Sequence, residues 1–269
     1  MPGLLFQTPR ARLRRLLDPG SPSPLARRTT MVTGASSGIG EATAVALAEA
    51  GASVAIGARR RDRLDGLAAR LGEAGAKVVT LDLDVTDEAS CRAAVDRTRS
   101  ELGGLDVLVN NAGLMLLGTI VGADTEDWRR MVDTNVMGLM YMTHAAIDGM
   151  LEQGSGDIVN ISSTAGRTAR AGAGVYNASK WAVNAFSESL RQEVTARGVR
   201  ISLVEPGAVE TELRSHITQP EAKAAALAHS EGMRSLRPED VARAIVYVVT
   251  QPPHVAVNEV LVRPTDQER

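Results

Sequence analysis

The stretch Thr33-Gly-Ala-Ser-Ser-Gly-Ile-Gly40 decides how this chain is expected to fold. An apolar run with β-branched residues, 29–32, precedes it, and a helix-like run, 41–50, follows it. Glycine permits positive φ and a close approach of a ligand, and the start of a helix offers free N–H groups and a positive dipole end to an anion. The stretch predicts a phosphate-binding turn between a strand and a helix, although a structural glycine turn has the same pattern.

The rest of the chain alternates between short apolar runs and longer helical ones. Most of the apolar runs are nearly continuous, as in strands that are covered on both faces. This alternation predicts one α/β domain with a Rossmann-type, doubly wound sheet of about seven parallel strands and helices on both faces. The expected strands are 29–33, 53–57, 77–83, 105–109, 156–161, 199–204 and 256–262, and the expected helices are 38–50, 61–74, 87–102, 124–151, 174–197 and 238–249.

The composition is that of an ordinary globular protein. Of the 269 residues, 44% are hydrophobic and 23% are charged, and the formal net charge is −2. This balance predicts no nucleic-acid partner and no membrane partner, and no apolar run approaches the roughly 18 residues of a membrane span. The single cysteine, Cys91, fits a reducing compartment, so a cytoplasmic location is expected. No His/Cys spacing predicts a metal site.

The first 28 residues differ in composition from the rest. They contain six arginines, one acid (Asp18) and a proline-containing linker, Gly20 to Pro24. The apolar core of a secretory signal does not follow the basic part. We interpret 1–28 as a mobile or loosely docked basic extension of a domain that covers 29–269, with contact to a partner subunit as the alternative.

The end of the second expected strand bears on the choice of cofactor. A dinucleotide site for NAD usually has a carboxylate about 20 residues past the glycines, where it holds the ribose 2′-hydroxyl. This chain has Ala58 there, followed by Arg59 and Arg60. Guanidinium groups pair with a 2′-phosphate, so we predict NADP(H), with Arg59 as the main contact and Arg60 as its helper. The alternative is that these arginines are a solvated helix start.

Two further strand ends offer cofactor contacts. Asp84 and Val85 end the third expected strand, and the Asp84 carboxylate can accept from an adenine amino group or cap the helix that begins near Asp87. The small residues of Asn110-Asn-Ala-Gly113 follow the fourth strand. They leave room for a ribose and a pyrophosphate in the crevice at the carboxyl ends of the strands.

Three side chains are candidates for the chemistry. Tyr176 and Lys180 lie four residues apart in an expected helix and share one face. The ordinary tyrosine pKa near 10 is too high for a base at neutral pH. The Lys180 ammonium and an oxidised nicotinamide are expected to lower the pKa of Tyr176. Ser163 ends the fifth strand, where its hydroxyl can hold the substrate oxygen. Taken singly, each of these residues also has an ordinary structural interpretation.

Taken together, these motifs resemble the short-chain dehydrogenase/reductase family over about residues 29–262. The resemblance implies that Tyr176 is the general acid, that Lys180 lowers its pKa and binds the nicotinamide ribose, and that Ser163 orients the carbonyl. Asn135 would hold a water in a proton relay behind Lys180. The implied cofactor contacts are Gly34, Ser36, Ser37, Gly38, Ile39, Gly40, Arg59, Arg60, Asp84, Val85, Asn111, Ala112, Gly113, Tyr176, Lys180, Pro206, Gly207, Val209 and Thr211.

The resemblance also implies an assembly and a branch of the family. Family members are commonly homotetramers, and a homotetramer (or homodimer) is expected here, with contacts from the helices 124–151 and 174–197. Several stretches, among them Asn111–Gly118 and Asn184–Glu193, are similar to clavulanate dehydrogenase-like bacterial reductases. That branch includes hydroxy-acid dehydrogenases.

The substrate pocket is expected from 113–118, 164–173 and a substrate loop at about 208–232. The first stretch is apolar, which suits an aldehyde or ketone. Arg167 or Arg170 would hold a carboxylate or, as the alternative, both point to solvent or to a neighbouring subunit.

The predicted function is NADPH-dependent reduction of a small-molecule aldehyde or ketone to an alcohol, with a role in secondary metabolism. A 3-oxoacyl-thioester reductase or a 3-hydroxy-acid dehydrogenase is the alternative on the same scaffold. A non-catalytic NADP-binding sensor or assembly subunit is the alternative of another class, and the intact Ser163, Tyr176 and Lys180 argue against it.

Overall fold

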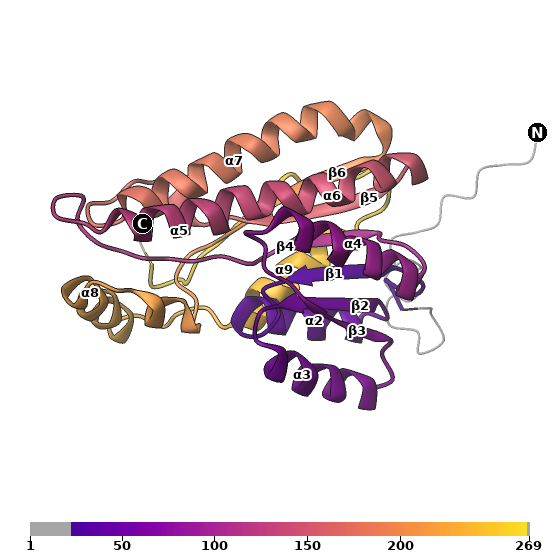
Figure 1. Ribbon diagram of the computed structural model, residues 1–269, viewed down its shortest axis with the longest axis horizontal. Coiled ribbons are helices and arrows are strands. Elements are labelled where there is room, and N and C mark those ends of the chain that lie inside the picture. The colour runs from indigo at the N-terminus through magenta and orange to yellow at the C-terminus, as the bar shows by residue number, and fades with distance from the viewer. Residues whose placement is uncertain (1–22, 268–269) are drawn as a thin grey trace, which may run out of the picture.

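The structure is a computed structural model that describes residues 23–267. Seven strands form one parallel sheet in the order β3-β2-β1-β4-β5-β6-β7 (Figure 1). The order runs outward from β1 on one side and from β4 on the other, so the topological switch point lies between these two strands, where α/β sheets bind ligands. The strands are β1 (Thr29–Thr33), β2 (Ser53–Ala58), β3 (Val78–Asp82), β4 (Val107–Asn110), β5 (Gly156–Ile161), β6 (Val199–Pro206) and β7 (Glu259–Val262).

Helices cover both faces of the sheet, as the alternating pattern predicts. The helices are α2 (Gly38–Glu49), α3 (Arg61–Glu73), α4 (Glu88–Leu102), α5 (Thr125–Val132), α6 (Gly138–Gln153), α7 (Gly174–Val194), α8 (Pro220–Glu231) and α9 (Pro238–Val249). Figure 1 shows α8 standing apart from the two helical layers. No helix within residues 23–267 has both the length and the apolar character that crossing a bilayer requires.

The two faces of the sheet bury two separate apolar clusters because side chains alternate along each strand. On β1, Val32 points into the cluster made with α2, α3 and α9, and Met31 points into the cluster made with α4, α6 and α7. On β4, Val109 and Leu108 divide in the same way. All four side chains are fully buried. Burial on both faces explains why these strands read as continuous apolar runs.

The single helix expected over 124–151 is divided in the structure. It consists of α5, a π-helical turn η1 (Asp133–Met137) and α6. The apolar pattern continues through the turn, so periodicity alone does not reveal the extra residue that a π-helical turn accommodates. Such turns are frequent at functional sites, and this one contains Asn135.

The described part of the expected N-terminal extension, residues 23–28, is packed against the domain. Leu25 is fully buried in the cluster with α2 and α9. Arg28 donates to the Asp157 carboxylate at 2.6 Å and to the Val249 carbonyl oxygen at 3.0 Å. This segment is therefore docked rather than loosely attached, and residues 1–22 lie outside the described residues.

Candidate active site

A cavity of about 820 Å³ lies at the carboxyl ends of the central strands. Its lining includes the glycine turn after β1, the ends of β2, β4 and β5, the start of α7, and the segment from β6 to α8. Of the predicted catalytic and cofactor-binding residues, all but Gly40 and Asn135 line this cavity. Residues that are far apart in the sequence meet here because the carboxyl ends of parallel strands share one edge of the sheet.

The glycine turn has the geometry of an anion cradle. Gly34 and Gly38 have positive φ angles of 67° and 57°. A Cβ on Gly40 would lie 2.4 Å from the carbonyl oxygen of Gly34, so Gly40 is needed for the turn to close on the helix. Asn111 supports the turn, because its Nδ2 donates to the carbonyl oxygens of Thr33 and Gly34 at 2.9 and 3.3 Å. These residues fit the pyrophosphate of a dinucleotide.

Arg60 makes most of the contacts at the cavity end where a 2′-phosphate was predicted. Its Nε and Nη2 donate to the hydroxyls of Ser36 and Ser37 at 3.0 and 2.6 Å, and its Nη1 pairs with Glu212 at 2.8 Å. Arg59 also lines the cavity. Arg60 is thus the arginine that is bonded to the glycine turn and to Glu212, whereas the sequence pattern favoured Arg59 as the main contact of the 2′-phosphate.

Asp84 does not cap α4. Asp87 caps that helix, because its carboxylate accepts from the backbone N–H of Ala89 at 3.0 Å. The Asp84 carboxylate accepts from the Thr86 backbone N–H and hydroxyl at 3.0 and 2.8 Å and faces the cavity rim. Burial acts to raise the pKa of Asp84, but the Thr86 hydrogen bonds and the Arg59 charge outweigh it and lower that pKa.

Ser163 and Tyr176 come together in the cavity. Both side chains line it, and the Ser163 hydroxyl is close enough to the Tyr176 phenol to affect its pKa by hydrogen bonding. The Ser163 oxygen also accepts from the Ala165 N–H at 3.1 Å, which fixes it at the start of the short helical turn η2 (Thr164–Gly166). Burial raises the pKa of Tyr176, and the hydrogen bond to Ser163 opposes that rise only in part. The protein alone therefore keeps the phenol protonated at neutral pH, in contrast to the lowered pKa that was predicted for the site with an oxidised nicotinamide.

Lys180 lies beneath the same site. Its Nζ is 5.9 Å from the centre of the Tyr176 ring and donates to the carbonyl oxygen of Ile161 at 2.8 Å. The side chain is buried, and burial lowers the pKa of Lys180 to about 8.

Asn135 is close to the site, but its side-chain amide is bonded to the backbone of Leu114 and to the hydroxyl of Ser179. Its Oδ1 accepts from the Leu114 N–H at 2.7 Å, and its Nδ2 donates to the Leu114 carbonyl oxygen at 2.8 Å and to the Ser179 hydroxyl at 3.1 Å. A Cβ on Gly113 would lie 3.4 Å from Asn135 Oδ1 and 3.9 Å from Lys180 Nζ. The missing side chain at Gly113 thus leaves the space between Asn135 and Lys180 open.

A buried polar network behind the cavity is not apparent from the sequence. Glu205 is fully buried and accepts from Arg167 Nε at 2.7 Å and from Asn184 Nδ2 at 2.9 Å. Arg167 also pairs with Glu259. The idea that Arg167 holds a substrate carboxylate is therefore wrong, because two carboxylates of the protein already bind it. The signal that could have pointed to the network is an acid, Glu205, inside an apolar strand.

The substrate end of the cavity combines apolar and basic side chains. Leu114, Met115 and Leu117 line it together with Arg170 and Arg214. Arg214 is partly buried, and burial lowers its pKa. Its Nη1 donates to the Val209 carbonyl oxygen at 3.4 Å, and it forms no ion pair with any described carboxylate. Sequence reasoning did not single out Arg214, because nothing in the pattern of the substrate loop distinguishes it from a surface arginine.

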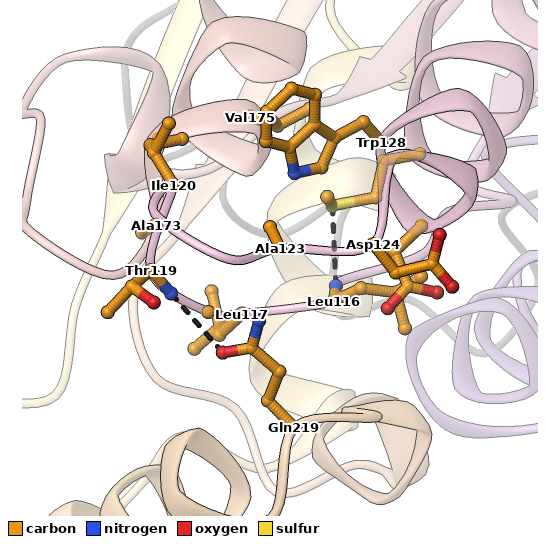
Figure 2. Close-up of a pocket in the computed structure, with 14 residues that line it drawn as sticks. Leu116, Leu117, Thr119, Ile120, Ala123, Asp124, Trp128, Ala173, Val175 and Gln219 are labelled. Atoms are coloured by element: carbon orange, nitrogen blue, oxygen red, sulfur yellow. Dashed lines mark hydrogen bonds between the residues drawn. The ribbon is translucent and has the colours of Figure 1, made fainter.

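A small pocket of about 10 Å³ lies next to this end, between the loop after β4, α5 and the start of α8 (Figure 2). Figure 2 shows Gln219 reaching the loop, where its Oε1 accepts from the Thr119 N–H at 3.3 Å. The Thr218 hydroxyl pairs with Asp127 on α5. These two contacts attach the start of α8 to the rest of the domain.

Within residues 23–267, no three His, Cys, Asp or Glu side chains gather as a metal site would require.

Comparisons with known proteins agree with this geometry. The model of the short chain dehydrogenase family matches residues 28–222. The chain is 43% identical over 254 residues to glycine betaine reductase ATRR of Emericella nidulans, and the match covers 94% of this chain and 20% of that protein. The chain thus spans about a fifth of the length of this curated relative.

Two solved structures resemble the whole described domain. A serine dehydrogenase complexed with NADP+ in its closed form is 37% identical, with a TM-score of 0.82, and the match covers 90% of this chain and 96% of that one. An alcohol dehydrogenase from the archaeon Thermococcus sibiricus, complexed with 5-hydroxy-NADP, is 30% identical, with a TM-score of 0.79, and the match covers 90% and 98% of the two chains.

Proposed function

Because this chain belongs to the short-chain dehydrogenase/reductase family and is an NADP-dependent oxidoreductase, we propose that it reduces an aldehyde or ketone to an alcohol. The observation that supports this most is that the hydroxyls of Ser163 and Tyr176 lie close to each other inside the cofactor-sized cavity. In this proposal the carbonyl oxygen of the substrate accepts from both hydroxyls, and Tyr176 then gives its proton to that oxygen.

The surroundings of Tyr176 suit a proton donor. A raised pKa keeps the phenol protonated at neutral pH, and a buried hydroxyl next to a reacting oxygen is shielded from water. We propose that Lys180 stabilises the phenolate that remains after the transfer, because its Nζ lies 5.9 Å from the ring centre. We propose that Ser163 orients the carbonyl and that Asn135, whose amide is bonded to the backbone of Leu114, holds a water in a proton relay behind Lys180.

The residues at the other end of the cavity would hold NADPH, which supplies the hydride when bound. The turn Gly34–Gly40 would receive the pyrophosphate, Arg60 and Arg59 the 2′-phosphate, and Asp84 the adenine amino group. The segment Pro206–Thr211 would face the nicotinamide. The positive φ angles of Gly34 and Gly38 and the place of Arg59 in the cavity wall support this arrangement.

The decisive experiment compares Tyr176→Phe with Tyr247→Phe, which alters an exposed tyrosine on α9. NADPH oxidation is followed by absorbance with a panel of aldehydes, ketones and 3-oxoacyl thioesters. Tyr176→Phe should lower kcat by about 10²–10⁴-fold and leave the Kd for NADPH nearly unchanged. Tyr247→Phe should behave like the natural protein. Retained turnover in Tyr176→Phe would contradict the proposal, and binding of NADPH without turnover of any carbonyl would favour the sensor or assembly alternative.

A second candidate, oxidation of a 3-hydroxy acid, is favoured by Arg214 and by the similarity to a serine dehydrogenase, since serine is a 3-hydroxy acid. Half-burial of a guanidinium is costly unless an anion compensates it. We propose that the substrate carboxylate compensates Arg214, which together with Val209 lies at the nicotinamide end. Arg214→Met should raise KM for serine or 3-hydroxypropionate about tenfold or more, and it should leave KM for uncharged alcohols within about twofold. Equal effects on both classes would remove this candidate.

An assembly through α5 and α7 is also proposed. Val132 and Trp181 are 40% and 52% exposed on these helices, and a second subunit on this face would cover both apolar side chains. Light scattering on the purified protein tests the expected homotetramer or homodimer. We also propose a cytoplasmic location and a role in secondary metabolism. Within the family, we propose that the chain belongs with the clavulanate dehydrogenase-like reductases.

A further inference from the structure

Two arginines bind one acidic side chain at an end of the cavity. Glu212 begins the short turn η4 (Glu212–His216), which leads from Thr211 to the substrate loop and α8. One carboxylate oxygen pairs with Arg60 at 2.8 Å, and the other pairs with Arg63 in the first turn of α3 at 2.7 Å. Two guanidinium groups from one side of the cavity therefore hold one carboxylate from the opposite side.

The same Arg60 reaches into the glycine turn. Its Nε and Nη2 donate to the Ser36 and Ser37 hydroxyls, and its Nη1 is bound to Glu212. The segment before Glu212 also touches this turn, because a Cβ on Gly38 would lie 3.1 Å from Cγ2 of Thr211. The Glu212 ion pairs thus join η4 to the start of α3 at the end of the cavity where the 2′-phosphate is expected.

From this geometry we infer that Glu212 competes with the 2′-phosphate of NADP(H) for Arg60. In the absence of that phosphate, the ion pairs of Glu212 with Arg60 and Arg63 hold η4 and the substrate loop to α3, and we call these ion pairs the latch. A phosphomonoester carries a charge of about −2 at neutral pH and offers three acceptor oxygens. It can therefore replace a single carboxylate on the two guanidinium groups. NAD(H) has a neutral hydroxyl at that position and cannot replace the carboxylate. The inference rests on the proposed role of Arg60 toward the 2′-phosphate.

The strength of the latch fits a replaceable contact. The Arg60 and Glu212 side chains are 38% and 43% exposed, and Arg63 is 43% exposed. Ion pairs this exposed contribute little to stability, since water and salt screen them. The hydrogen bonds from Arg60 and Arg63 lower the pKa of Glu212 to about 2, so the carboxylate stays charged throughout the pH range in which the enzyme can be assayed.

The test measures cofactor binding rather than turnover. NADPH and NADH are titrated by fluorescence and by calorimetry into the full-length protein, Glu212→Gln and Glu210→Gln. Glu210 is exposed two residues earlier, does not line the cavity, and loses the same charge. Two exposed ion pairs together correspond to a factor of about three to ten, so Glu212→Gln should tighten NADPH binding by that factor. Its Kd for NADH, and both Kd values of Glu210→Gln, should match the natural protein.

A double variant separates this inference from its premise. Arg60→Met alone should reduce the preference for NADPH over NADH, and in that background Glu212→Gln should have no further effect. If Arg60→Met leaves the preference unchanged, the premise fails and the inference with it. If Arg60→Met reduces the preference but Glu212→Gln leaves NADPH binding unchanged, weakens it, or tightens NADH binding equally, competition by Glu212 is overturned. None of these outcomes depends on whether Tyr176 transfers a proton, so they are distinct from a failure of the proposed reaction.

A measurement without any cofactor tests the latch itself. Hydrogen exchange of the backbone amides in η4 should be faster in Glu212→Gln than in the natural protein and in Glu210→Gln, because the ion pairs that hold this turn to α3 are lost. Unchanged exchange in η4 would overturn the latch.

Discussion

Asn184 donates from its Nδ2 to the buried carboxylate of Glu205 at 2.9 Å, and this bond joins α7 to the end of β6. The Ser162 hydroxyl donates to the Oδ1 of the same asparagine at 2.5 Å. Asn184 lies one helical turn after Lys180, and Ser162 immediately precedes Ser163. The two elements that carry the proposed catalytic side chains are therefore fixed to each other through Asn184, whose amide is also bound by the fully buried Glu205.

Arg167→Met should destabilise the protein, because it leaves the buried Glu205 charge without its guanidinium partner. Loss of one partner of a buried pair costs about 3–5 kcal/mol, and the partial exposure of Arg167 reduces this to about 2–3 kcal/mol. Urea unfolding gives the free energy directly. Arg92→Met removes an exposed i,i+4 pair with Glu88 and should have a far smaller effect, because water screens such a pair. A cost for Arg167→Met no larger than that of the control would contradict the role given to the network.

Lys180→Met should stabilise the protein at pH 7 and flatten the pH dependence of its stability. The pKa of Lys180 is lowered by burial to about 8 from an ordinary 10.5. Below pH 8 both folded and unfolded chains carry the proton. Between about 8 and 10.5 the unfolded chain binds more protons than the folded one, so the contribution of Lys180 to the free energy of unfolding rises with pH. Lys180→Met removes this rise with pH. It also removes the cost of burying the ammonium, so the free energy of unfolding at pH 7 should increase by on the order of 1–3 kcal/mol.

The measurement is urea unfolding of both proteins at a series of pH values from about 7 to about 10, which spans the titration of a lysine shifted in this way. Lys77→Met serves as the control, because Lys77 is exposed. The difference in stability between Lys180→Met and the natural protein should shrink as the pH rises, whereas the Lys77→Met difference should stay constant. A difference that grows with pH would show that the ammonium is stabilised in the folded state.

The fold could be predicted from the sequence because its central strands are buried on both faces. Each of the seven apolar runs became a strand with small shifts at the ends, such as β7, which begins at Glu259 rather than at 256. The convergence of these residues has a related reason. In a parallel sheet every residue that follows a strand lies at one edge, so Asn111, Ser163 and Gly207 line the same cavity as the glycine turn.

The features that could not be predicted depend on contacts between distant residues. Arg167 and its partner Glu259 are 92 positions apart, and no local pattern connects them. Which of two successive arginines turns toward Ser36 depends on the backbone at the start of α3, and that choice favours Arg60. The π-helical turn around Asn135 leaves the apolar pattern undisturbed. Propensity and periodicity carry no information on any of these.

One substitution at two glycines should have opposite effects. In Gly40→Ala the new Cβ would lie 2.4 Å from the Gly34 carbonyl oxygen and 2.5 Å from Asn111 Nδ2. Backbone atoms cannot move aside cheaply, so we expect a loss of about 1–3 kcal/mol in stability together with weaker NADPH binding. Gly66 is exposed within α3, and a Cβ added there would meet no other atom within 4 Å. Gly66→Ala should therefore add about 0.5–1 kcal/mol. Thermal and urea unfolding check both values, and stabilisation by Gly40→Ala would refute the packing argument.

Gln219→Ala should loosen α8 without unfolding the domain. Figure 2 shows the Gln219 side chain filling the space beside the loop after β4, where a Cβ on Gly118 would lie 2.4 Å from it. Loss of its hydrogen bond to the Thr119 N–H should lower the free energy of local opening by about 1 kcal/mol, which corresponds to roughly fivefold faster tryptic cleavage after Lys223 in α8. Gly118→Ala should act in the same direction, because its methyl group displaces the Gln219 side chain. Gln192→Ala changes an exposed glutamine on α7 and should leave the rate unaltered. If Lys223 is cut equally fast in all four proteins, Gln219 does not anchor this helix.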